Sequence, residues 1–388
     1  MKQRFSKRTR LVSALLTLAM VFTFLPISAF AATDSYGPVY LDDRIVPDDT
    51  FREYLLKQFD KDHNGTLYPA ERYAVTEIDV NDKNITSLKG IEFFPNLKKL
   101  DCGHNRLTSL DVSKNTVLQE LVCWENQLTG LDVSQNTALQ ELECFENKLT
   151  SLDVSQNPAL QKLSCWDNRL TSLDVSKNTE LTYLNCSYNR LKELDVSKNS
   201  DLVWLGCGSN SLTELDVSRN PKLEMLLCAD NQLTELDLSK NTALTELDCS
   251  GNHLTSLELT SSIKDTDFKA DGNVYDITID RTDRTFDLSS LPGNFKPEKV
   301  QQWNGGSVKS GTSILTVDKG VSQVTYTYDC GFSRKAVFTL RVTETGSAPV
   351  DPPVTPPEPP VTPPSGGGDG GGAVVIVAAA GAAVAGVV

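Results

Sequence analysis

Histidine is scarce in this chain of 388 residues, which contains only three. His63, His104 and His253 have no cysteine or serine partner at a spacing that nucleophilic catalysis uses. The many carboxylates follow a regular sequence period, and none is set apart as acid–base catalysis would require. We therefore expect a protein without enzymatic activity.

An excess of positive charge is also missing. Lysine and arginine together number 37 against 51 aspartates and glutamates, which gives a net charge of −14. Nucleic acids and anionic membrane surfaces are bound mainly through lysine and arginine. The charge balance therefore argues against both kinds of partner.

Long apolar runs occur only near the two ends of the chain. Residues 1–31 combine a basic start, an apolar run and the small-residue site Ala29-Phe30-Ala31, which is typical of a secretory signal; a retained membrane anchor is the alternative. Residues 373–388 are uncharged but shorter than the roughly 20 residues of a membrane span, and no LPxTG sorting signal precedes them. A membrane anchor, a truncated anchor and a disordered apolar tail are all open, and we favour a tail that associates with the membrane. The expected location is extracellular, either secreted or attached to the cell surface.

What the chain has in abundance is a 21-residue repeat. Cysteine recurs at a constant step of 21, and asparagine follows each cysteine three residues later. Such a fixed interval predicts a solenoid, because each coil must place the same atoms against the coil before it. The cysteines are Cys102, Cys123, Cys144, Cys165, Cys186, Cys207, Cys228 and Cys249, and the first three asparagines are Asn105, Asn126 and Asn147.

The cysteine spacing disfavours disulfides, although an exported protein would often contain them. Residues one repeat apart lie on neighbouring parallel strands about 4.8 Å apart, with parallel Cα–Cβ bonds. A disulfide needs Cβ atoms about 3.8 Å apart that point toward each other. We therefore predict a ladder of eight reduced, buried thiols, while Cys330 stands outside the series.

Each coil has an apolar interior and two turns. After the inward residues are placed, only about six positions remain for the outer side, too few for a regular helix. The fold class is therefore mainly β, a right-handed solenoid of about ten coils over residues 75–275 with one parallel sheet. In one coil the inward residues are Leu118, Leu121, Cys123, Leu128, Leu131 and Val133, and the turns lie at Asn126 and Asn136.

The segment before the repeats, residues 32–74, predicts a small helical cap. Residues 47–59 have helical apolar spacing, and residues 60–71 follow the EF-hand calcium-loop pattern, with Gly65 at the sharp turn. We predict a structural calcium ion here; a loop that caps the solenoid without metal is the alternative. The predicted ligands are Asp60, Asp62, Asn64, Thr66 and Glu71.

Beyond the repeats the period stops. Residues 285–288, 299–303, 313–317, 323–328 and 336–342 alternate apolar and polar side chains, which predicts a small immunoglobulin-like β-sandwich over 276–344. Residues 345–372 form a linker rich in proline and glycine.

The open face of the predicted sheet carries the candidate binding residues. Side chains two residues apart point to the same side of a strand, so this face can be identified from the sequence. Two groups of large apolar side chains, each spanning three consecutive coils, interrupt a polar surface on this face. Exposed aromatic side chains surrounded by polar groups are typical of interaction sites. Aromatics that only cover the sheet and support each other are the alternative. The predicted contact residues are Trp124, Phe145, Trp166, Tyr183, Trp204, Met225, Glu120, Glu141 and Glu143.

An aspartate series follows another side of the coils. Its members either collect divalent ions or form a solvated face whose charge is offset by nearby lysines and arginines; we favour the solvated face. They are Asp111, Asp132, Asp153, Asp174, Asp195, Asp216 and Asp237.

The pattern L-x-x-L-x-C-x-x-N-x-L in these coils resembles the leucine-rich repeats of bacterial surface proteins of the internalin-like group. The coils differ in carrying cysteine where internalins more often carry leucine, and 21 rather than 22 residues. The resemblance implies a non-enzymatic binder with an EF-hand-like cap and an Ig-like module. We expect a protein partner on a cell surface or in the extracellular space, with a carbohydrate-binding adhesin or a passive surface spacer as alternatives.

Overall fold

The computed structural model describes residues 37–261 and 263–346. The predicted signal peptide and C-terminal tail, and all but the first two residues of the predicted linker, lie outside these residues. One compact unit extends to Thr345. Within the described residues, no helix is both long enough and apolar enough to cross a membrane.

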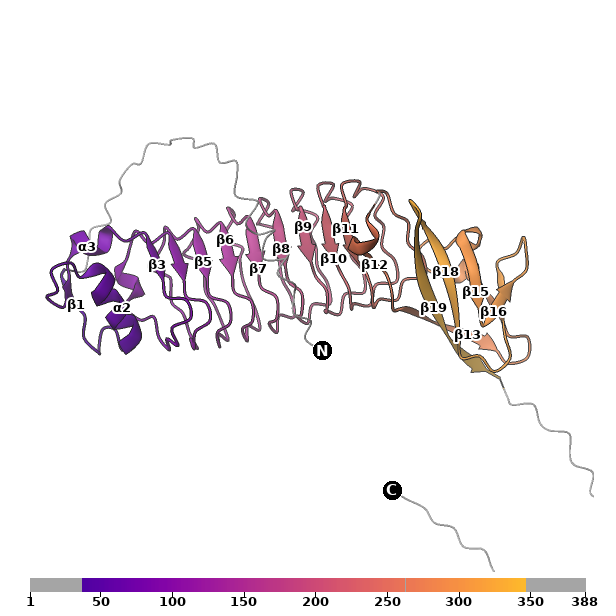
Figure 1. Cartoon of the computed structure of the whole chain (residues 1–388), viewed down its shortest axis with the longest axis horizontal. Coiled ribbons are helices and arrows are strands. Elements are labelled where there is room, and N and C mark those ends of the chain that lie inside the picture. Colours follow the sequence, from indigo (N-terminus) through magenta and orange to yellow (C-terminus); the bar gives the residue numbers. More distant parts are fainter. Residues whose placement is uncertain (1–36, 262, 347–388) are drawn as a thin grey trace, which may run out of the picture. The chain divides into compact units, whose positions relative to one another are not determined.

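A ten-stranded parallel sheet runs through the repeats, with its strands in sequence order from β3 to β12 (Figure 1). Every pairing from β4 onward joins residues one repeat apart, such as Leu121 and Leu142. The prediction of a mainly β solenoid is confirmed. The strands are β3 (Glu77–Asp79), β4 (Lys99–Asp101), β5 (Glu120–Val122), β6 (Glu141–Glu143), β7 (Lys162–Ser164), β8 (Tyr183–Asn185), β9 (Trp204–Gly206), β10 (Met225–Leu227), β11 (Glu246–Asp248) and β12 (Phe268–Lys269).

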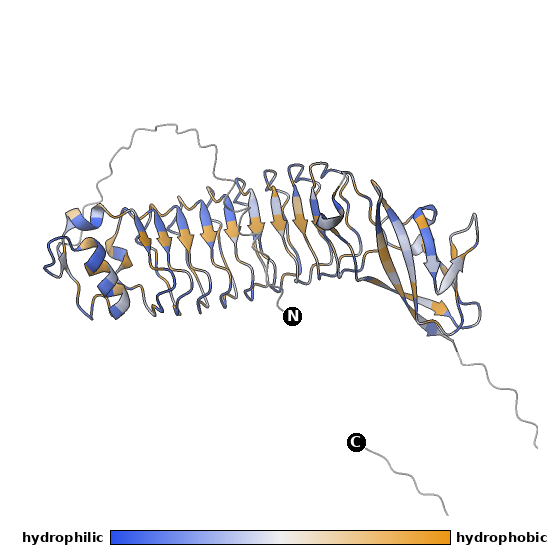
Figure 2. Ribbon diagram, viewed as in Figure 1, coloured by the Kyte–Doolittle hydropathy of each residue, from blue (hydrophilic) through white to orange (hydrophobic). Residues whose placement is uncertain are grey.

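The interior of the solenoid is built from the repeated leucines, valines and cysteines. Apolar residues recur at the same place on successive strands (Figure 2). All eight ladder cysteines are buried and carry free thiols. Burial penalises the thiolate, which raises the pKa of Cys186 to about 12 from its ordinary value of 9.0. The thiols therefore pack as small, neutral, apolar side chains.

Two asparagine series hydrogen-bond neighbouring coils together at the turns. The Nδ2 of Asn126 donates to the carbonyl of Cys102 in the preceding coil at 3.0 Å, and its Oδ1 accepts from the Leu107 amide at 2.9 Å. In the other series, the Nδ2 of Asn136 donates to the Asn115 carbonyl at 2.9 Å. These side chains satisfy backbone groups that the bends leave without strand partners.

The N-terminal segment folds into α2 (Asp49–Phe59), α3 (Pro69–Tyr73) and the antiparallel pair β1 (Val39–Tyr40) and β2 (Thr66–Leu67). The Asp48 side chain starts α2 by accepting from the amide of Phe51 at 3.0 Å. The same carboxylate accepts from the amide of Thr86 in the first coil at 2.7 Å. Thus the segment covers the β3 end of the solenoid (Figure 1), where the short 3₁₀ helix η1 (Ile91–Phe93) follows.

The segment after the repeats contains two further sheets. The four-stranded sheet has the order β13-β19-β18-β15, and the three-stranded sheet has the order β14-β17-β16. Each predicted strand segment overlaps an observed strand, whereas β13 and β16 were not predicted, and the predicted boundary at 275/276 lies inside β13. The elements are β13 (Asn273–Asp280), β14 (Thr285–Asp287), β15 (Val300–Asn304), β16 (Gly306–Val308), β17 (Ile314–Val317), β18 (Gln323–Gly331) and β19 (Arg334–Thr345), with 3₁₀ helices η2 (Asp265–Asp267), η3 (Leu288–Ser290) and η4 (Pro297–Lys299).

Hydrogen bonds connect this segment to the last coils. The Tyr326 hydroxyl donates to the Thr255 carbonyl at 2.6 Å, and the Leu259 amide donates to the Cys330 carbonyl at 2.9 Å. Cys330 is buried and carries a free thiol. The apolar interior therefore continues from the coils into the following sheets.

Candidate functional site

The strand face is defined here as the outward side chains of β3 to β12 together with the residue after each cysteine. The central residue of each strand from β3 to β11, such as Leu142 in β6, is fully buried, so the residues on either side of it point outward. Because the pairing is in register, equivalent side chains lie about 4.8 Å apart in rows across the sheet. The predicted contact residues occupy three of these rows.

The first aromatic group is a continuous stack, which we call the aromatic ladder: His104, Trp124, Phe145 and Trp166. The rings of Trp124 and Phe145 are 5.5 Å apart and inclined by 5°, and those of Phe145 and Trp166 are 4.8 Å apart and inclined by 13°. His104 extends the ladder, at 6.0 Å and 8° from Trp124. His104 was not predicted as part of this group, because it lies one position beyond the aromatic row, directly after Gly103.

Glycine at 103 makes room for this stack. A Cβ atom at Gly103 would lie 2.6 Å from Nε1 of Trp124. The indole therefore leans toward the preceding coil, above Gly103, and reaches the imidazole of His104. A glycine one repeat before a tryptophan was a sequence signal for this arrangement.

The second aromatic group lies on the next strands. The rings of Tyr183 and Trp204 are 4.4 Å apart and inclined by 14°, and Met225 follows opposite Trp204 on β10. Burial raises the pKa of Tyr183 to about 12, although the ammonium of Lys162, 5.9 Å from the ring centroid, acts in the opposite direction. The phenol is therefore neutral at physiological pH.

All six predicted apolar contact residues are half-buried rather than exposed, because neighbouring side chains cover part of each one. The exposed aromatic among the coils is Tyr188, whose side chain is 47% accessible. It lies two residues after Cys186 and has a left-handed backbone with φ of 55°. Other coils place acidic residues such as Glu125 at this position, which is why the repeat pattern did not single out Tyr188.

The predicted acidic residues are arranged around lysines. Lys162 forms ion pairs with both Glu141 and Glu143, and Lys99 pairs with Glu120 at 2.9 Å. Burial raises the pKa of Glu143, although Lys162 acts against this shift. Burial alone would lower the pKa of Lys162, but the two carboxylates outweigh it and hold the pKa above its ordinary value. Two carboxylates and one ammonium leave this cluster with one net negative charge.

The aspartate series has a structural role at the turns. The Oδ1 of Asp132 accepts a hydrogen bond from the Ser134 amide at 2.9 Å, and this bond lowers the pKa of Asp132. The same bond forms in each coil of the series. None of these aspartates belongs to a group of three potential metal ligands within the described residues. The equivalent pairs are Asp111–Ser113, Asp153–Ser155, Asp174–Ser176, Asp195–Ser197, Asp216–Ser218 and Asp237–Ser239.

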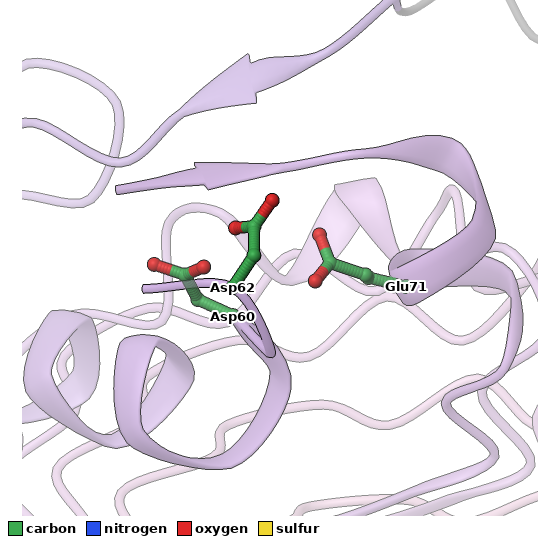
Figure 3. Close-up of side chains that lie close together, drawn as sticks. All are labelled: Asp60, Asp62 and Glu71. Carbon is green, nitrogen blue, oxygen red and sulfur yellow. The ribbon is translucent and has the colours of Figure 1, made fainter. Parts of the chain in front are cut away.

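The acidic loop between α2 and α3 brings three predicted calcium ligands together. Oxygen atoms of Asp60, Asp62 and Glu71 lie within 4.8 Å of one another (Figure 3). Gly65 has the positive φ of 78° that the sharp turn requires, and its amide donates to Asp60 Oδ2 at 2.8 Å. Burial acts to raise the pKa of Asp60, but this bond and a second from the Asn64 amide outweigh it, and the pKa is lowered.

The other loop residues hold this arrangement. The Glu71 carboxylate accepts from the amides of Lys61 at 2.9 Å and Tyr68 at 3.0 Å, which ties both ends of the loop to α3. Asn64 Oδ1 accepts from the Thr66 amide at 2.8 Å. The oxygen donors are of the hard type that suits calcium.

Comparisons with known proteins identify the repeats. A family model described as leucine-rich repeats in two copies matches residues 158–199 and 221–261. Internalin J of Listeria monocytogenes serotype 4b (strain F2365) is 38% identical over 70 residues, which cover 18% of this chain and 8% of that protein. Thus these two segments of the solenoid match leucine-rich repeats, and only a small part of internalin J is matched.

One solved structure supports the same fold. Listeria monocytogenes InlP has a TM-score of 0.53 and 19% identity, covering 79% of this chain and 99% of that one. The functional domain of Listeria monocytogenes InlJ, described as including a cysteine ladder, is 24% identical over the same coverage, with a TM-score of 0.25. At 19% identity the likeness to InlP concerns the fold alone.

Proposed function

We propose that this protein is a non-enzymatic extracellular binding protein that recognises a protein partner through the strand face of its leucine-rich repeats. The observation that carries the proposal is the aromatic ladder, together with the stacked pair Tyr183 and Trp204. These rings lie on the open side of the parallel sheet, among polar side chains. The proposal includes an EF-hand-like cap, an Ig-like module after the repeats and a location at the cell surface or outside the cell.

The aromatic groups suit a binding surface for energetic reasons. Tryptophan and tyrosine bury large areas on binding and lose little conformational entropy, and they are enriched among residues that dominate interface energies. Stacking on neighbouring coils already fixes the rings in place, so little further ordering is needed when a partner binds. The rigid solenoid therefore presents a preformed surface.

The thiols support a binding role over a catalytic one. Nucleophilic catalysis by cysteine requires an accessible thiolate. The ladder thiols are buried and their pKa values are raised by that burial, as for Cys165 and Cys207. They therefore serve the packing of the coils.

The proposal is tested by removing two indoles from the face. We expect the full-length protein to capture defined extracellular proteins from a panel, and the double variant Trp124→Ala/Trp166→Ala to lose that binding. Phe332→Ala is the matched control, because Phe332 is 52% exposed but lies in the hairpin between β18 and β19, outside the strand face. Retained binding in the tryptophan variant would contradict the proposal.

The same variants distinguish the alternatives. Stacked tryptophan and phenylalanine rings also suit sugar rings, so glycan-array binding that disappears in the double variant would assign a carbohydrate ligand. Full-length protein that binds neither proteins nor glycans would point to a passive surface spacer.

We also propose that the acidic loop holds a calcium ion with a structural role. Asp60, Asp62 and Glu71 would supply carboxylate oxygens, Asn64 its amide oxygen and Thr66 its backbone carbonyl. A bound ion would neutralise carboxylates that lie close together and would connect the end of α2 to α3. The cap would then be held firmly at the point where the solenoid interior would otherwise be open to solvent.

A further inference from the structure

Like charges face each other on neighbouring strands in the first half of the strand face. Asp79 of β3 lies directly opposite Asp101 of β4, and Glu120 of β5 lies directly opposite Glu141 of β6. Directly opposed like charges destabilise a sheet. A leucine-rich solenoid can place any polar residue at these outward positions, so the fold does not require this arrangement.

Lysines on the face show how a cation fits between such carboxylates. Lys162 bridges Glu141 and Glu143, which both lie on the preceding strand β6, and its ammonium also lies 5.9 Å from the ring centroid of Tyr183. Lys99 similarly lies between Glu120 at 2.9 Å and Glu77 at 4.0 Å. An ammonium group on this face can therefore contact two carboxylates at once, either on one neighbouring strand or on the two strands that flank it.

The two lysines do not neutralise the first half of the face. Among the described residues, neither Asp79 nor Asp101 forms an ion pair; Asp101 accepts instead from Asn81 Nδ2 at 3.2 Å. The Glu141–Lys162–Glu143 cluster keeps one negative charge, because it contains two carboxylates and one ammonium. Further carboxylates lie beside this half of the face, two positions after the cysteines. Glu125 and Asp167 are two of them, and both are exposed.

Basic side chains lie just beyond the face. Arg106, Lys148, Arg169 and Arg190 occupy the position after the turn asparagine in their coils, and all four are exposed. In the part of the chain that the structure describes, none of them forms an ion pair with a carboxylate of the face. The surface thus changes from negative to positive over a few residues, and a cationic partner would be attracted to the face and repelled at this edge.

We propose that the first half of the strand face binds a basic segment of a protein partner, whose lysine or arginine side chains bridge the carboxylates of neighbouring strands beside the aromatic ladder. This inference rests on the proposed function, because it names the chemistry of the partner for the same face. Charge complementarity selects a basic protein segment. The adjacent indoles and phenyl ring cover the aliphatic parts of its side chains and attract their charged groups.

The test uses a fluorescein-labelled nona-arginine peptide and full-length protein at physiological ionic strength. The variant Asp101→Asn/Glu141→Gln removes one charge from each like-charged pair and keeps a hydrogen-bond acceptor at both positions. The control Glu193→Gln/Glu214→Gln removes the same number of charges from exposed positions outside the strand face. Fluorescence anisotropy should show that Kd rises about tenfold in the face variant and changes less than about twofold in the control.

A second readout separates this inference from simple attraction by net charge. Without peptide, the single variant Asp101→Asn should have a higher Tm than the wild type, because it removes an opposed like charge without breaking an ion pair, whereas the control should not. Equal weakening of peptide binding in both variants, or no weakening in the face variant, would overturn the inference.

The protein partner found in the capture experiment distinguishes the proposed function from the inference of a basic segment. If its binding requires Trp124 and Trp166 but is unchanged in Asp101→Asn/Glu141→Gln, the cation inference fails and the proposed function stands. If the peptide depends on the carboxylates while the tryptophan variant keeps its protein partner, the cation inference is supported and the aromatic face proposal fails.

Discussion

The indole of Trp204 lies across Gly206, two residues later in the same strand. A Cβ atom at Gly206 would be 2.6 Å from Cζ3 of the indole and 3.0 Å from Oδ1 of Asn185. The absent side chain is what allows the tryptophan to lie against the sheet and stack on Tyr183 at 4.4 Å. An outward glycine thus determines where an aromatic side chain of the face is held.

The substitution Gly206→Ala should displace the indole of Trp204. A methyl group at this position cannot coexist with the observed ring, and overpacking of this kind costs about 1–3 kcal/mol. We expect a lower Tm and an altered near-ultraviolet circular dichroism spectrum. Gly130→Ala is the control, since a Cβ atom there meets nothing within 4 Å, and it should leave both measurements unchanged. An unchanged spectrum in Gly206→Ala would contradict the assigned contact.

Replacing one turn asparagine should weaken the whole solenoid. Asn157 is fully buried, and its Nδ2 donates to the carbonyls of Val133 at 3.0 Å and Asn136 at 2.9 Å. Asn157→Ala leaves two buried carbonyls without these partners, which should cost about 2–5 kcal/mol in urea denaturation. The neighbouring exposed Gln156→Ala should change the free energy of unfolding by less than about 0.5 kcal/mol. Similar values for both variants would show that the asparagine series does not hold the coils together.

The sequence was sufficient to predict the solenoid because the repeat determines the register. A step of 21 residues brings Leu121 opposite Leu142, and the buried cysteines and asparagines follow from the same step. Asp60, Asp62 and Glu71 lie near one another because all three belong to one loop of twelve residues, and the calcium they are predicted to bind stays a prediction.

The details of the face depended on side-chain directions that a repeat pattern does not contain. The leaning of Trp124 toward His104 depends on the space above Gly103, and the half-burial of the rings depends on stacking between coils. The hydrogen bond that each aspartate accepts from the serine amide two residues later was not predicted, because the repeat pattern shows Asp132 and its equivalents as a row of charges and does not show the turn. Strand β13 was missed because it begins at Asn273, inside the last repeat, and then joins a different sheet.

Alkaline pH should lower the free energy of unfolding, because the cysteine thiols lose protons more readily in the unfolded chain than in the folded one. Burial raises the folded-state pKa of Cys186 and Cys228 to about 12, whereas the ordinary value is 9.0. Between these values the unfolded chain releases protons that the folded chain retains, so stability falls as pH rises above 9. Each such thiol contributes a slope of about 1.4 kcal/mol per pH unit. Urea denaturation from pH 7 to 11 should therefore show a steep loss of stability above pH 9.

Two controls isolate the thiols in this experiment. Cys186→Ala should reduce the slope of the free energy of unfolding against pH, above pH 9, by the contribution of one thiol. It also lowers stability at pH 7 through the lost packing. A thiol reagent should modify the native protein only very slowly at pH 8 and all nine cysteines after unfolding. Rapid labelling of the native protein, or fewer than nine thiols after unfolding without a reductant, would contradict the buried reduced ladder.

Calcium should stabilise the cap through the acidic loop. Adding calcium to chelator-treated protein should raise Tm, because an ion that binds the folded loop shifts the equilibrium away from the unfolded chain. Glu71→Gln should abolish most of this rise while retaining an oxygen that can accept from the amide of Lys61 or Tyr68. Glu53→Gln, at an exposed position of α2, should respond to calcium like the wild type. If calcium leaves the Tm of the wild-type protein unchanged, the loop caps the solenoid by its hydrogen bonds alone.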